Sequence, residues 1–85
     1  MTVSNCRLTA NGSCGFAGAG QRYYVQNTNR QRGIRVTYEV TNDVTGSFQK
    51  TIGVAAGGTQ FIGCSRSNNA GGGRNSFRIV GCQVL

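Results

Sequence analysis

Four cysteines are the residues of this chain whose chemistry is easiest to foresee. Cys6, Cys14, Cys64 and Cys82 could either form disulfides or hold a zinc ion as thiolates. Zinc sites usually take cysteines in close pairs such as C-x2-C, whereas the shortest gap here is seven residues. The spacing therefore favours two disulfides, with four reduced, packed thiols as the alternative. Disulfides in turn predict an oxidising compartment or a particle surface.

The stretch GCSRSNNAGGGRNSFRIVGC, residues 63–82, has Gly-Cys at both ends and a glycine run between them. Folded as a hairpin with paired positions summing to 146, it would place Cys64 opposite Cys82, close enough for a disulfide. Cys6 and Cys14 would then pair by elimination. Sequence alone does not choose the connectivity, and a bridge from the N-terminal segment to a later strand stays open. The stretch lacks the lysine and the helical pattern of a phosphate-binding loop.

Residues for catalysis are scarce. The chain has no histidine, which removes the commonest general base and metal ligand. Its two acidic residues, Glu39 and Asp43, would lie about 13 Å apart on a continuous strand, farther than the roughly 5–9.5 Å that paired glycosidase carboxylates use. We therefore expect no enzyme, and neither a metal nor another cofactor.

Positive charge is the strongest compositional feature. Nine basic residues against two acidic ones give a net charge of +7, and all basic residues except Lys50 are arginines. Arginine forms paired hydrogen bonds to phosphate and carboxylate, so this bias favours an anionic partner; the alternative is that these charges only keep the protein soluble. The candidate anion-binding residues are three arginines around the glycine-rich tip and three in or after a polar turn: Arg66, Arg74, Arg78, Arg30, Arg32 and Arg35.

The elements that position these residues are predicted to be strands. Residues 34–41 alternate apolar and polar, and an apolar parity returns in residues 48–54, interrupted by Lys50. Pairing positions whose numbers sum to 88 puts the apolar side chains on one face, which fixes the register. This hairpin places Val36 opposite Ile52, Tyr38 opposite Lys50 and Val40 opposite Phe48.

Further strands are predicted at residues 22–27, 59–65 and 75–85, with a weaker candidate at 2–8, and no segment has a helical period. Short strands with frequent turns indicate an all-β fold. We expect a single domain, residues 1–85. It should be a small antiparallel β-sandwich (Ig-like or Greek-key type) or a barrel of about five to seven short strands, stapled by disulfides.

Two functions fit these features. The first is a non-enzymatic structural or interaction module, extracellular or at a particle surface, that self-associates or coats a virion, filament or cell surface. The apolar terminal segments could pair with a neighbouring copy or within their own domain. The second is an Arg-rich module that binds nucleic acid or acidic polysaccharide. No apolar run is long enough for a membrane span, and the first residues lack the apolar core of a signal peptide.

Overall fold

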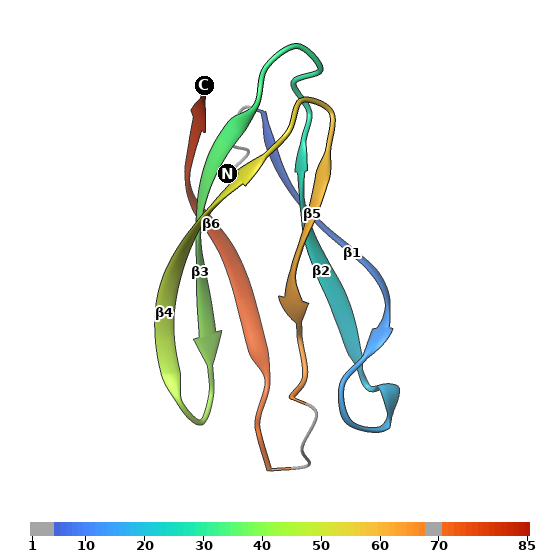
Figure 1. Cartoon of the computed structure of the whole chain (residues 1–85). Coiled ribbons are helices and arrows are strands. Elements are labelled where there is room, and N and C mark those ends of the chain that lie inside the picture. Colours follow the sequence, from blue (N-terminus) through green and yellow to red (C-terminus); the bar gives the residue numbers. More distant parts are fainter. Residues whose placement is uncertain (1–4, 68–70) are drawn as a thin grey trace.

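The computed structural model describes residues 5–67 and 71–85, and these residues form an all-β domain, as the sequence predicts (Figure 1). The domain contains two disulfides, which the sequence also predicts. Within these ranges no helix is long and apolar enough to cross a membrane. The predictions for residues 2–4 and for residues 68–70 before the glycine run lie outside the described residues. The elements are β1 (Cys6–Cys14), η1 (Phe16–Gly18), β2 (Gly20–Asn27), β3 (Ile34–Asn42), β4 (Gly46–Val54), β5 (Thr59–Cys64) and β6 (Asn75–Val84).

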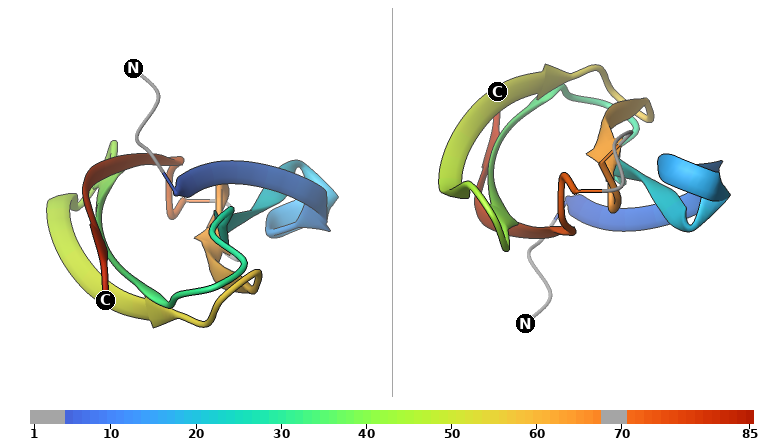
Figure 2. Two further views of the ribbon diagram at one scale, coloured as in Figure 1. Left: turned by 90° about the horizontal axis from the view of Figure 1, so that it is seen from above. Right: turned by 90° about the horizontal axis from the view of Figure 1, so that it is seen from below.

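The strands form two antiparallel sheets, in the orders β1-β2-β5 and β4-β3-β6. Figure 2 shows the β4-β3-β6 sheet curving around one side of the interior, with the β1-β2-β5 sheet on the opposite side. The hairpin of β3 and β4 is confirmed in the predicted register, with Val36 opposite Ile52, Tyr38 opposite Lys50 and Val40 opposite Phe48. Both terminal strands pair inside their own domain, β1 with β2 and β6 with β3.

The core lies between the sheets and is contributed by both. Val25 of β2 and Ile34 and Val36 of β3 are fully buried, and they pack with Cys6 and Val54. Farther along, the ring of Tyr23 in β2 stacks on Phe77 of β6, with their centroids 4.9 Å apart. Because successive side chains of a strand point to opposite faces, these contacts define the inner face of each sheet.

The predicted pairing of the cysteines is wrong, although all four are in disulfides. Cys6 bonds to Cys82 and Cys14 bonds to Cys64. The predicted hairpin of β5 and β6 does not form, because β5 joins β2 in one sheet whereas β6 joins β3 in the other. Near the tip the two segments do meet, at a bridge between Arg66 and Arg74, and beyond it they diverge into separate layers.

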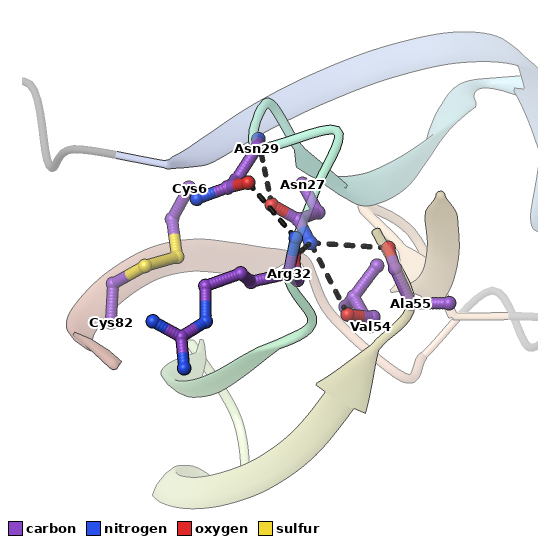
Figure 3. The surroundings of a disulfide bond; sticks show 7 residues. All are labelled: Cys6, Asn27, Asn29, Arg32, Val54, Ala55 and Cys82. Atoms are coloured by element: carbon purple, nitrogen blue, oxygen red, sulfur yellow. Dashed lines mark hydrogen bonds between the residues drawn. A yellow bond between two sulfur atoms is a disulfide. The ribbon is translucent and has the colours of Figure 1, made fainter. Parts of the chain in front are cut away.

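The two disulfides hold different parts of the fold. Cys6–Cys82 links β1 to β6 and so ties the two sheets together (Figure 3). Cys14–Cys64 joins the two outer strands of one sheet across the middle strand β2. A Cβ atom at Gly20 of β2 would lie 2.9 Å from the Cys64 sulfur and 2.9 Å from the Arg66 backbone nitrogen. Glycine at position 20 thus lets the bridge and the following segment lie directly over the strand.

A buried amide joins three segments at the opposite end of the sheets (Figure 3). The side chain of Asn27 is 1% exposed, and its nitrogen donates to the carbonyl oxygens of Arg32 (2.8 Å), Ala55 (3.1 Å) and Val54 (3.4 Å). Its oxygen accepts a hydrogen bond from the backbone nitrogen of Asn29. Asn27 therefore fastens the β2–β3 loop to the end of β4, next to the inter-sheet disulfide.

Candidate anion-binding surface

Two of the predicted anion-binding arginines lie together. Arg66 and Arg74 face each other at the bridge between the ends of β5 and β6. Both line a hollow of about 310 Å³ together with Ala19, Ser65, Asn75 and Ser76. The Arg74 backbone nitrogen donates to a carboxylate oxygen of Asp43, 2.8 Å away. An acidic group therefore lies beside this pair and partly offsets its positive charge.

Arg78 does not join this pair. In the expected 146 register it would share a face with Arg66 near the tip, but β6 pairs with β3 and places Arg78 opposite Glu39. Its guanidinium lies 2.8 Å from the Glu39 carboxylate, in a pair that is largely exposed on the Arg78 side. The charge of Arg78 is therefore matched locally, on the outer face of the β4-β3-β6 sheet.

The other three predicted arginines are distributed elsewhere. Arg30 and Arg32 are exposed in the loop between β2 and β3, at the opposite end of the domain from the β5–β6 connection (Figure 1). Arg35 is exposed on β3, between Gly53 and Gln83 of the neighbouring strands. The six predicted arginines thus occupy three separate regions and do not form one site. These regions are the β5–β6 connection, the β2–β3 loop and the outer face of the β4-β3-β6 sheet.

A second concentration of charge lies on the outer face of the β1-β2-β5 sheet. Because Tyr23 and Val25 point into the core, the alternate residues of β2 point outward, and their cross-strand partners point with them. We call this surface the arginine–aromatic face, and its members are Arg7, Thr9, Arg22, Tyr24, Gln26 and Phe61. Arg7 and Arg22 are both exposed. Arg7 of β1 lies opposite Gln26 of β2, and the distance along β2 from Gln26 to Arg22 is about 13 Å.

The acidic residues are segregated from this face. Glu39 and Asp43 are the chain's two acidic residues, and they belong to β3 and to the turn that follows it. The arginine–aromatic face lies on the other sheet, so Arg7 and Arg22 have no carboxylate on their own sheet. Elsewhere in the interior, burial raises the pKa of the Tyr38 phenol above its ordinary value.

Sequence reasoning did not select Arg7, Arg22 or Phe61. The signal in the sequence is the pattern of Arg22, Tyr23 and Tyr24, in which Arg22 and Tyr24 share one face of a strand. Two neighbours complete the face, since β2 pairs with β1 on one side and with β5 on the other. No family model, curated protein or solved structure matches this chain.

Proposed function

We propose that the protein is a non-enzymatic module that binds an anionic polymer through the arginine–aromatic face. The observation that carries this proposal is the segregation of charge: Arg7 and Arg22 lie on a sheet without acidic residues, whereas Glu39 and Asp43 lie on or beside the other sheet. A positively charged surface without neighbouring carboxylates attracts polyanions and raises their association rate. The disulfides support a setting in an oxidising environment, which we place outside the cell or at a particle surface.

The Arg66–Arg74 pair, whose charge Asp43 partly offsets, extends this surface beyond the start of β2. A Cβ atom at Gly15 or Gly20 would meet Arg66 at 2.8 or 2.9 Å, so Arg66 lies directly over the segment that leads into β2. The positive surface then runs from Arg7 at the start of β1, past Arg22, to Arg66. A run of arginines fits a polymer that carries phosphate, sulfate or carboxylate groups at intervals, because each guanidinium can form two hydrogen bonds to one such group.

Replacing both Arg7 and Arg22 by glutamine is expected to weaken the binding of DNA or heparin, because two unmatched charges leave the face. On DNA, each lost phosphate contact should reduce the slope of log K against log salt by about 0.7–0.9. Retention on heparin and titrations with labelled single-stranded DNA at several salt concentrations measure both effects.

The matched control removes two arginines from the other sheet. The variant Arg35→Gln/Arg78→Gln has the same net charge as the test variant, but it leaves the arginine–aromatic face intact. It should retain most of the wild-type affinity and salt dependence. Equal losses in the two variants would show that net charge alone matters and would contradict this site. A wild-type protein that is not retained on either polymer would contradict the proposed function.

Self-association is the second candidate function, and it is favoured by the free edge of one sheet. β4 pairs with β3 along all nine of its residues, and among the described residues no strand pairs with its other edge. Phe48 in this strand is 55% exposed beside a hollow of about 170 Å³ between the sheets. Lys50, however, points from the same strand toward the inner face and is exposed. An inward-pointing charge on an edge strand opposes pairing with another chain, so we place self-association second.

Replacing Lys50 by isoleucine is expected to promote association, because it removes the charge that a second strand would have to bury. Light scattering and size-exclusion chromatography over a concentration series would show a larger species for Lys50→Ile. The variant Lys50→Arg keeps the charge and should behave like the wild type. An isoleucine variant that remains as monomeric as the arginine variant would show that Lys50 does not protect this edge.

A further inference from the structure

An aromatic hollow lies within the arginine–aromatic face. It has a volume of about 380 Å³ and is lined by Cys14, Arg22, Tyr24, Phe61 and Cys64. The volume is within the range of small-molecule binding sites. The lining therefore consists of a disulfide, two aromatic rings and an arginine.

The aromatic pair leaves ring surface open to this hollow. Tyr24 and Phe61 face each other across β2 and β5, with centroids 5.5 Å apart and ring planes at 64°. In an edge-to-face pair only one face of one ring is covered by its partner, and Phe61 is 51% exposed. The other aromatic pair of β2, between Tyr23 and Phe77, is nearly parallel, at 29°, and lies between the sheets. Tyr24 and Phe61 are thus the pair available to a ligand.

Two arginines lie near the rings, where their positive charges could bind the phosphates of a nucleic acid backbone. Arg22 lines the hollow itself, and its stem lies over β1, where a Cβ atom at Gly12 would be 3.7 Å from the Arg22 Cδ atom. Arg7 lies about 13 Å farther along the sheet. Single-stranded nucleic acid is bound by this combination, in which bases stack on exposed aromatic rings while basic side chains follow the backbone.

We infer that the hollow binds a base of single-stranded nucleic acid by stacking on Phe61 and Tyr24, with Arg22 and Arg7 binding the phosphates on either side. This inference rests on the proposed function and specifies its polymer. It favours nucleic acid over acidic polysaccharide because the hollow presents two rings and a disulfide. These surfaces suit a flat base better than a sugar ring, which needs hydrogen-bonding partners for its hydroxyl groups. A duplex does not fit the inference, because its bases are already stacked on each other.

The test compares two oligonucleotides that differ only in their bases. Oligo(dT) and an abasic strand of the same length have the same phosphates, so an interaction with phosphates alone would bind them equally. We expect the wild type to bind oligo(dT) about 5- to 100-fold more tightly than the abasic strand. Phe61→Ala should remove most of this difference, so that it binds the two strands with similar affinity. Fluorescence anisotropy of labelled strands measures both affinities.

Two further variants make the result specific. Phe61→Leu keeps an apolar side chain but removes the ring, so it should also lose the preference for oligo(dT). Phe48→Ala removes a ring of similar exposure (55%) from β4 and should keep the preference. Circular dichroism and non-reducing peptide mapping confirm that each variant has the native fold and disulfides.

The outcomes separate this inference from the proposed function. If the wild type binds oligo(dT) and the abasic strand equally, or if Phe61→Ala and Phe61→Leu keep the preference for bases, base stacking at this hollow is overturned while polyanion binding stands. If the wild type binds heparin but neither strand, the polymer is not nucleic acid. If it binds none of these polymers, both the inference and the proposed function fail.

Discussion

Removing the inter-sheet disulfide with Cys6→Ala/Cys82→Ala is expected to lower the free energy of unfolding by about 4 kcal/mol. The bond closes a loop with a sequence separation of 76 residues, so its loss greatly increases the conformational entropy of the unfolded chain. Domains of this size have only about 5–10 kcal/mol of stability in total, and this variant is expected to be partly unfolded at physiological temperature. Urea denaturation followed by circular dichroism measures the change.

The variant Cys14→Ala/Cys64→Ala is the matched comparison. Its disulfide has a sequence separation of 50 residues, so the loop-entropy contribution is of similar size, again about 4 kcal/mol. This bond lies within one sheet, so its loss leaves the covalent link between the sheets in place. A loss below about 1 kcal/mol for the Cys6/Cys82 variant would contradict the role assigned to that disulfide. Peptide mapping without reduction should recover both pairs, 6–82 and 14–64.

Replacing Asn27 by alanine is expected to lower the free energy of unfolding by about 2–4 kcal/mol. The substitution removes every hydrogen bond of a side chain that is 1% exposed. It also leaves three carbonyl oxygens without this donor, that of Val54 in a buried position and those of Arg32 and Ala55 in partly buried ones. Such unpaired buried groups cost more than the hydrogen bonds themselves contribute. Urea denaturation gives the change in stability.

Thr28→Ala is the control for this substitution. Thr28 is the next residue and its side chain is exposed, so its loss should change the free energy of unfolding by less than about 0.5 kcal/mol. Hydrogen exchange should locate the effect of Asn27→Ala in the β2–β3 loop and at the end of β4, which the amide joins. Equal stability of the two variants would mean that backbone contacts alone hold this end of the domain.

Elements joined by short turns could be predicted from the sequence. The β3–β4 hairpin has the register expected from its alternation, because the buried face of Val36 and Val40 determines which residues of β4 can lie opposite them. The strands predicted at residues 22–27, 59–65 and 75–85 are also observed, as β2, β5 and β6, where β-forming residues cluster between turn signals. In each case the evidence lies within a few residues of the element.

The cysteine pairing could not be predicted in the same way. The connection between β5 and β6 suits a hairpin as well as a passage from one sheet to the other, and its near-symmetry favoured the hairpin. In the folded protein β6 pairs with β3, and its Phe77 stacks on Tyr23 of the facing sheet. That contact joins residues far apart in the sequence, so no local pattern reveals it.

The sequence by itself determined the fold class, the presence of disulfides, the β3–β4 register and the excess of positive charge, because these depend on composition and on short-range alternation. The tertiary structure alone decided which cysteines meet, that Arg78 pairs with Glu39, and that Arg22, Tyr24 and Phe61 surround one hollow. The physical reason is the choice of neighbour for each strand. That choice follows from burying apolar surface across the whole chain, and it brings together side chains that no spacing along the sequence connects.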